Sequence, residues 1–182
     1  MRIELSDDIE LRLLEETDAR EVHALVEANR DHLGEWMPWA RNQDFERTAR
    51  FLRATAQKHE RGEALEGAIV ENGRIVGCAG LPVIDPVARA GIVGYWIAKE
   101  HEGQGLVTRA VSALIDHAFG ELDLHRVEIR AATDNVRSRA VPERLGFTQE
   151  GVLREAELVG GEYQDLAVYG LLAGEGKPAS GT

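Results

Sequence analysis

The sequence predicts one α/β domain with a mixed sheet flanked by helices, and three observations indicate this fold class. Residues 91–98 (GIVGYWIA) are rich in β-branched and aromatic side chains with little alternation, which is typical of a strand covered on both faces. Across residues 106–119 apolar side chains recur at spacings of three and four, as on one stripe of a helix. Residues 126–131 (RVEIRA) form a second predicted strand, parallel to the first because a helix joins the two. No break in composition divides residues 1–173, so they are predicted to form a single domain.

The chain before the central strand is predicted to contain two hairpins and two helices. Two short strands, residues 3–5 and 9–14, flank a polar turn. Thr17 or Asp18 is expected to cap a helix over residues 19–29. Asn72-Gly73 joins strands at residues 65–71 and 74–83, because both residues accept the positive φ angles of a type I′ turn.

The second helix is predicted over residues 44–61, ahead of Gly62. The apolar side chains expected to be buried on it are Phe45, Ala49, Phe51, Leu52 and Ala56. The segment before it, residues 32–42, is expected to be irregular because Pro38 blocks a helix. Its aromatic cluster, residues 36–39 (WMPW), allows two readings: the tryptophans fill the base of the domain, or they line a ligand pocket.

The C-terminal part is predicted to hold a short helix and two closing strands. The helix spans residues 135–145, with a kink or a late start because of Pro142. The antiparallel strands are residues 147–153 and 163–172, around a turn with two glycines. Residues 174–182 lack an apolar anchor and are predicted to be disordered.

Composition excludes several classes of protein. The net charge of -11 disfavours nonspecific binding to nucleic acid or anionic membranes, and no apolar run reaches the roughly 20 residues of a membrane helix. The lone Cys78 cannot form an intramolecular disulfide, which together with the lack of a secretory signal favours the cytoplasm. Cys78 has no paired histidine signature and is expected to be a small core residue. The six histidines show no metal-ligand spacing, so no metal site is predicted.

The loop at residues 99–105, between the central strand and the central helix, is predicted to bind a phosphorylated ligand. Gly103 and Gly105 allow positive φ angles and a close approach to the backbone, and the amides at a helix N-terminus attract anions. Parallel strands that diverge here would leave a slot beside the loop. No Lys-Ser or Lys-Thr follows Gly105, and the third glycine of a dinucleotide fingerprint would fall at Thr108, so both of those motifs fail. The alternative is that the two glycines only shape a tight turn.

Three sequence segments resemble the GCN5-related N-acetyltransferase (GNAT) superfamily. Residues 100–105 (EHEGQG) resemble its acyl-CoA loop, Gln/Arg-x-x-Gly-x-Gly/Ala, although Glu100 departs from the first position. Asp134-Asn135-x-x-Ser138 and residues 142–147 (PERLGF) look like the RimJ/RimL-like branch, which acetylates N-terminal amines of ribosomal proteins. Weaker likeness covers residues 36–39 and 163–172. The resemblance implies a central mixed sheet of about seven strands flanked by about four helices.

The resemblance also implies a set of site residues. It places Glu157 as the general base and Ser138 as the acid that protonates the departing thiolate, since the tyrosine of many relatives is replaced here by Pro142. The residues expected to bind acetyl-CoA are Trp96, Ile97, Ala98, His101, Gly103, Gln104, Gly105, Leu106, Val107, Thr108, Asn135 and Ser138. The residues expected to bind the acceptor are Trp36, Met37 and Trp39. Candidates for the cofactor's phosphates are Arg109, Arg137 and Arg139.

Other roles for these residues remain open. Glu157 can also be a solvated loop acid, Asn135 and Ser138 can cap a helix, and the arginines can form a solvated basic face. The leading interpretation is a bacterial-type enzyme that transfers acetyl from acetyl-CoA directly to a primary amine, the N-terminus of a ribosomal protein. The alternatives are a small amine acceptor, such as an aminoglycoside, a polyamine or an amino-acid-like molecule, and a binding module without catalysis. The oligomeric state is left open, a homodimer included.

Overall fold

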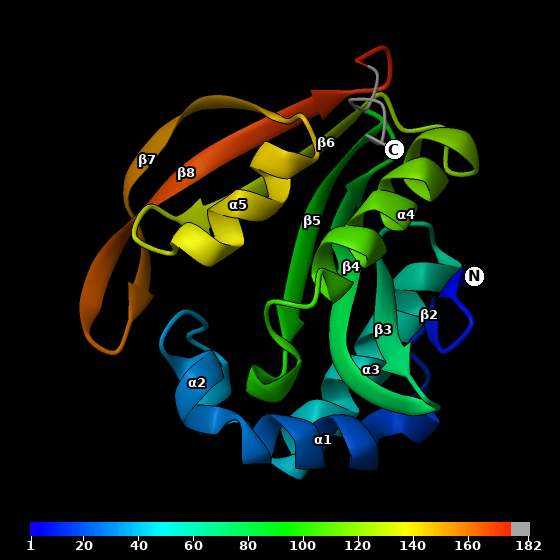
Figure 1. The fold of residues 1–182 in the computed structure, drawn as a ribbon, viewed down its shortest axis with the longest axis vertical. Coiled ribbons are helices and arrows are strands. Elements are labelled where there is room, and N and C mark those ends of the chain that lie inside the picture. The colour runs from blue at the N-terminus through cyan, green and yellow to red at the C-terminus, as the bar shows by residue number, and fades with distance from the viewer. Residues whose placement is uncertain (176–182) are drawn as a thin grey trace.

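The computed structural model describes residues 1–175, whose strands form a single eight-stranded sheet in the order β1-β2-β3-β4-β5-β6-β8-β7 (Figure 1). The strands are β1 (Arg2–Ser6), β2 (Ile9–Leu13), β3 (Leu65–Glu71), β4 (Arg74–Asp85), β5 (Ala90–Ile97), β6 (Arg126–Ala132), β7 (Thr148–Val159) and β8 (Glu162–Leu172). The α-helices are α1 (Ala19–Ala28), α2 (Arg30–Gly34), α3 (Phe45–Glu60), α4 (Leu106–Gly120) and α5 (Val136–Arg144). Short 3-10 helices are η1 (Glu16–Asp18), η2 (Ala40–Asn42) and η3 (Lys99–His101). The predicted fold class is confirmed, with α2 and η2 in the segment predicted to be irregular.

The sheet opens beside the end of β5. All pairs of adjacent strands in the sheet are antiparallel except β5 and β6, whose predicted parallel pairing is confirmed. The pairing of β5 with β6 ends at Val93 and Ile129, and the rest of β5 pairs only with β4. Because β8 continues past the end of β6, the last part of β5 and the first part of β8 flank a gap in backbone pairing.

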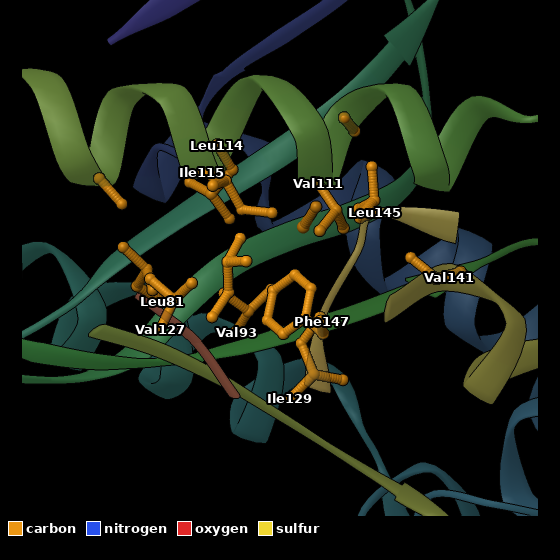
Figure 2. Close-up of a cluster of buried hydrophobic side chains, with 14 of the residues drawn as sticks. Leu81, Val93, Val111, Leu114, Ile115, Val127, Ile129, Val141, Leu145 and Phe147 are labelled. Atoms are coloured by element: carbon orange, nitrogen blue, oxygen red, sulfur yellow. The ribbon is translucent and has the colours of Figure 1, made fainter. Parts of the chain in front are cut away.

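The larger core lies between the sheet and α4. The predicted stripe of α4 is confirmed, since Val111, Leu114 and Ile115 are fully buried. Figure 2 shows them directed at side chains of the central strands, such as Val93 and Val127. The parallel strands and the helix that joins them therefore form one packed unit, as their apolar patterns require.

A second core lies on the opposite face, under α1 and α3. It contains Val22 and Val26 of α1 together with Leu52 of α3. The predicted burial of two aromatic residues on α3 is wrong, because Phe45 is 42% and Phe51 is 46% exposed. The helix instead buries Thr48, Leu52 and Thr55, whose spacing of four and three residues makes one stripe.

Several local predictions are confirmed. Asn72 and Gly73 have φ angles of 50° and 76°, as the hairpin between β3 and β4 requires. Cys78 is buried in the second core, where burial raises the pKa of its thiol well above the usual range. The Asp44 side chain caps α3 by accepting a hydrogen bond from the Arg47 amide at 2.8 Å.

Two boundaries differ from the predictions. Asp18 precedes α1, but its carboxylate makes no capping bond there; it accepts from the Glu15 amide and from the Arg12 guanidinium, each at 2.8 Å. β7 extends to Val159 rather than residue 153, because irregularities in its pairing let it follow the long β8. Of the tail predicted to be disordered, all but Gly174 and Glu175 lies outside the described residues. Over residues 1–175, no helix has the length and apolar character needed to cross a membrane.

Candidate functional site

The loop between β5 and α4 presents a run of free backbone amides. The amide of His101 donates to Ala98 O at 3.0 Å and that of Glu102 to Lys99 O at 3.3 Å, so both are used within η3. The amides of residues 103–108 donate to no carbonyl within residues 1–175, and the first bond of α4 joins the Arg109 amide to Gly105 O at 3.0 Å. The free loop amides therefore begin at Gly103, and the backbone amide of His101, a residue expected to bind acetyl-CoA, is not among them.

The geometry of this loop fits phosphate oxygens. Gly103 and Gly105 have φ angles of 74° and 73°, and a Cβ placed on either would meet no atom within 4 Å. The space in front of the amides is thus open, and the positive end of the α4 dipole points into it. Gln104 lies between the glycines and is tied back to Glu100 O by its Nε2 at 3.2 Å. Leu106 is buried at the start of α4, whereas Val107 and Thr108 are half-buried.

A Gly105→Val variant is expected to lose at least tenfold in CoA affinity, measured by calorimetry, because valine is strained at this φ angle and projects into the open space. A Gly105→Asn variant tolerates the φ angle better and should still weaken binding. Gly120→Val, at the other end of α4, is the control for a side chain added in open space. Unchanged CoA affinity in a folded Gly105→Val protein would show that the phosphates bind elsewhere.

The end of β5 supplies a second part of the candidate cofactor site. Trp96 and Ile97 pair with β4 at Cys78 and Gly77, and their other backbone edge is not paired with β6. Ala98 donates its amide to Val76 O at 2.9 Å. Backbone groups on the free edge can bind amide groups of a ligand as an added strand would.

The N-terminal turn of α5 faces this edge of β5. Asn135 Oδ1 accepts from the Ser138 amide at 3.0 Å, so Asn135 is the cap of α5. The Ser138 hydroxyl donates to the Tyr95 hydroxyl at 3.2 Å, and Tyr95 in turn donates to Ser138 O at 2.8 Å. Burial raises the pKa of Tyr95 well above its usual range, so the phenol stays protonated. Tyr95 thus fixes the position of Ser138.

The three candidate arginines differ in what they contact. Arg139 donates from Nε to the Tyr169 hydroxyl at 2.9 Å and from Nη1 to Thr133 O at 3.0 Å, so it attaches α5 to the sheet rather than facing a ligand. Arg137 is exposed and pairs with Glu102 of the loop, which also lies 3.3 Å from His32 Nε2. Arg109 is exposed on the first turn of α4. Arg109 and Arg137 remain candidates for phosphate binding.

Glu157 lies on β7 rather than in a loop. Its Cα partner is Gln164 of β8, and the residues before it form a bulge in which residues 154–156 oppose the single Asp165. Glu155 in this bulge has a φ of 51°, and its amide donates to Asp165 Oδ1 at 2.8 Å. Glu157 is half-buried, and this burial raises the pKa of its carboxyl. A carboxylate with a raised pKa is better suited to accept a proton near neutral pH.

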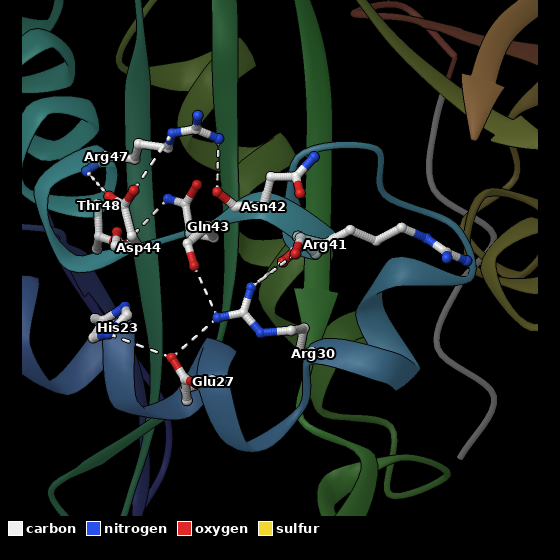
Figure 3. A network of polar contacts seen from close by, with 10 residues as sticks. His23, Glu27, Arg30, Arg41, Asn42, Gln43, Asp44, Arg47 and Thr48 are labelled. Carbon is white, nitrogen blue, oxygen red and sulfur yellow. Dashed lines mark hydrogen bonds and ion pairs between the residues drawn. The ribbon is translucent and has the colours of Figure 1, made fainter. Parts of the chain in front are cut away.

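Polar contacts hold the aromatic segment, residues 36–39, in place. The Arg30 guanidinium donates to the carbonyls of Ala40 (3.1 Å), Arg41 (3.0 Å) and Gln43 (2.8 Å) and to Glu27 at 3.0 Å, as Figure 3 shows in part. Arg41 donates from Nε to Gly34 O at 2.8 Å, and its guanidinium would lie 3.3 Å from a Cβ at Gly160. Arg41 therefore brings this segment next to the β7–β8 turn.

The side chains of the aromatic segment have unequal environments. Trp39 is 41% exposed, and its ring meets that of Trp96 edge-on with the centroids 6.2 Å apart. Trp36 is half-buried, and Met37 packs against the second core. Met37 thus fills the base of the domain, where one reading placed the tryptophans, while Trp39 offers a ring surface beside β5. Acceptor binding by these residues stays a prediction.

Sequence reasoning missed Tyr95, Arg30 and Arg41. Val93, Tyr95 and Ile97 alternate along β5, so their side chains lie on the same face of the strand, in the core that α4 covers. Because residues of α5 belong to the same core, strand alternation alone could have placed Tyr95 near α5. The two arginines bind backbone carbonyls, which have no sequence signature.

Comparisons with known proteins agree with this geometry. A family model described as Acetyltransferase (GNAT) domain matches residues 8–148. The chain is 39% identical over 173 residues to the putative ribosomal N-acetyltransferase YdaF of Bacillus subtilis (strain 168), with 94% of each protein covered. It is 30% identical over 168 residues to the ribosomal-protein-serine acetyltransferase of Escherichia coli (strain K12), with 92% of this chain and 94% of that protein covered.

Among solved structures, RimL, a ribosomal L7/L12 alpha-N-protein acetyltransferase in complex with coenzyme A, superimposes with a TM-score of 0.91 at 29% identity. The alignment covers 94% of this chain and 98% of that one. The family model and the relatives span the β5–α4 loop, α5 and the strands around them. The predicted resemblance is therefore confirmed: the chain belongs to the GNAT acetyltransferase family and is an N-acetyltransferase.

Proposed function

We propose that the protein transfers an acetyl group from acetyl-CoA directly to the N-terminal amine of a ribosomal protein. One observation carries the proposal: the free amides of residues 103–108 and the half-buried Glu157 lie on elements that flank the same gap in the sheet, between β5 and β8. The names of the relatives supply the acceptor class. Ribosomal proteins are made in the cytoplasm, which is where we place the reaction.

The residues around the loop fit the donor. The amides of residues 103–108 would hold the phosphates at the positive end of α4, with Arg109 beside them. The free edge of β5 would bind the amides of the pantetheine arm, and Asn135 can add its Nδ2 because only its Oδ1 is used as the cap. Acetyl-CoA supplies the acetyl group as a thioester, with the CoA thiolate as leaving group.

Two side chains of the protein move protons in this proposal. Glu157 takes a proton from the acceptor ammonium, so that the nitrogen lone pair becomes free to attack. Ser138 turns its hydroxyl from Tyr95 toward the departing sulfur and donates its proton there, while the bond from the Tyr95 hydroxyl to Ser138 O keeps Ser138 in place. The lone thiol is no candidate for a covalent intermediate, because Cys78 is buried in the second core and its pKa is raised. This supports direct transfer.

The acceptor is expected to approach along the aromatic segment. Trp39 exposes a rigid ring next to β5, and Arg41 links this segment to the turn that follows Glu157. A peptide N-terminus could lie between the ring and the carboxylate, with the rest of its chain leading out to solvent. A polyamine or an aminoglycoside would instead favour a closed acidic pocket.

Trp39→Ala is expected to raise the Michaelis constant for a peptide by about fivefold or more and to leave that for acetyl-CoA nearly unchanged, because truncation of an aromatic anchor typically costs over about 1 kcal/mol. Phe51→Ala removes an aromatic ring of similar exposure from α3 and serves as the control. The acceptor class is read by mass spectrometry of peptides with free and blocked N-termini. Acetylation of lysine side chains, spermidine or an aminoglycoside alone, with free N-termini untouched, would refute the proposed function.

A further inference from the structure

Gln164 carries a buried acceptor that has no partner. Its Oε1 is shielded from solvent and accepts no hydrogen bond from any group in residues 1–175. Among the other described side chains that are not exposed, His23 Nδ1 shares this condition, whereas His101 Nδ1, which also makes no hydrogen bond, lies 2.8 Å from Glu71 Oε2. A buried polar atom without a partner lowers stability, so its presence calls for an explanation.

The position of Gln164 connects it to the proposed reaction. Gln164 lies directly opposite Glu157 in the antiparallel pairing of β7 with β8, so the two side chains leave the same face with Cβ atoms about 5 Å apart. The opposite face of β8 carries Tyr169, which bonds to Arg139 and Glu143 of α5. β6 ends where Ala132 pairs with Leu166, so Gln164 lies beyond it, at the gap in the sheet.

The bulge in β7 creates this pairing. Leu153 is opposite Leu166, and regular pairing from there would put Glu155 opposite Gln164. The two extra residues of the bulge put Glu157 there instead, and the bond from the Glu155 amide to Asp165 stabilises that arrangement. Bulges next to active sites commonly re-aim a side chain in this way.

We propose that Gln164 is a second contact for the acceptor amine, with its amide oxygen accepting a hydrogen bond from the same ammonium group that Glu157 deprotonates. This inference rests on the proposed function through the assignment of Glu157 as the base. A primary ammonium has three N–H bonds, so it can serve both acceptors. After one proton moves to Glu157, the lone pair forms the new N–C bond, and the C–S bond breaks as Ser138 gives its proton to the departing sulfur. The second proton that the nitrogen loses on becoming an amide restores the Ser138 hydroxyl, and the bond to Gln164 keeps the nitrogen oriented throughout.

The Gln164 amide is free to make this contact. Its Nε2 donates to no group in the described residues, so rotation of the side chain sacrifices no hydrogen bond. Rotation of the Gln164 side chain toward the gap moves Oε1 from a place without a hydrogen-bond donor to the charged ammonium group of the substrate. Hydrogen bonds to charged groups are stronger than those between neutral groups. Substrate binding thereby removes the cost of the unpaired acceptor.

Gln164→Met tests the proposal, because methionine keeps the size of glutamine without its amide. The Michaelis constant for the amine that the wild type acetylates best is expected to rise about tenfold, with that for acetyl-CoA unchanged. The melting temperature is expected to rise by about 2 to 4 °C, because a buried unpaired polar atom is removed. Reduced acceptor binding in a more stable protein separates a substrate contact from a structural role.

Two further variants complete the test. Gln164→Glu keeps an acceptor oxygen and should retain a nearly normal Michaelis constant for the amine, while its charge opposite Glu157 should move the acid limb of the rate profile to higher pH. Gln149→Met changes an exposed glutamine of the same hairpin and should alter neither constant.

The inference and the proposed function fail in different ways. If Gln164→Met keeps the amine constant within about twofold of wild type, or raises the acetyl-CoA constant equally, Gln164 is not an acceptor contact. If the wild type acetylates spermidine and not peptide N-termini, the ribosomal acceptor is wrong. The comparison of Gln164→Met with wild type then uses spermidine and still decides the role of Gln164.

Discussion

Glu157→Gln is expected to lower turnover by about 10²- to 10⁴-fold, because the change removes a positioned proton acceptor and keeps its shape. The base works only when it is ionised, so wild-type kcat/KM should rise as the pH increases through the pKa of Glu157. Burial raises that pKa, so this acid limb should lie at higher pH than it would for a solvent-exposed glutamate. The limb should be absent from the pH profile of the variant.

Ser138→Ala is the matched comparison. It should also lower turnover, but it should retain the acid limb, since Glu157 is unchanged, and both variants should bind CoA nearly as well as wild type. Rates are read from the release of free thiol with a saturating amine. Turnover of Glu157→Gln within about twofold of wild type would assign the proton transfer to another group.

Glu66→Gln is expected to remove a large pH dependence of stability. Glu66 lies on β3 and is buried. Burial raises the pKa of its carboxyl from 4.5 to about 7, and the positive charge of Lys58 opposes this shift more weakly. Between these two values the folded protein keeps the proton that the unfolded chain loses. The free energy of unfolding should therefore fall as the pH rises from about 4.5 to 7, in total by about 3 kcal/mol.

Urea unfolding of wild type and Glu66→Gln at pH 5 and pH 8 measures this effect. The difference between the two proteins isolates Glu66, because other titrating groups contribute equally to both. Glu4→Gln, which changes an exposed acid on β1, is the control and should unfold in parallel with wild type. Equal slopes with pH for wild type and Glu66→Gln would show that the Glu66 carboxyl is ionised in the folded protein.

The Glu66 side chain depends on a glycine in the neighbouring strand, a relationship that no pattern in the sequence indicates. A Cβ on Gly80 of β4 would overlap Glu66 Oε2, so the neighbouring strand needs glycine there to accommodate the carboxyl group. In the sequence, Glu66 is only one polar residue in an otherwise apolar strand. The lateral pairing of β3 with β4, Glu66 opposite Gly80, creates the relationship.

Features that depend on neighbouring residues could be predicted from the amino-acid sequence alone. The turn at Asn72-Gly73, the left-handed conformations of Gly103 and Gly105 and the buried stripe of α4 follow from local φ preferences and from the helical period. The parallel pairing of β5 with β6 followed from the helix that connects them. These features are sufficient to predict the fold class and the loop that would hold the cofactor's phosphates.

Features that depend on distant segments could not be predicted from the sequence and follow from the packing of the folded chain. The exposure of Phe45 and Phe51, the contact of Tyr95 with Ser138 and the position of Arg41 next to Gly160 depend on which faces meet. The place of Glu157 depends on the bulge in β7, since a shift of register changes which side chains are opposite one another. Periodicity gives the face of each element, but the partner of that face is set by packing and strand register, to which residues far apart in the chain contribute together.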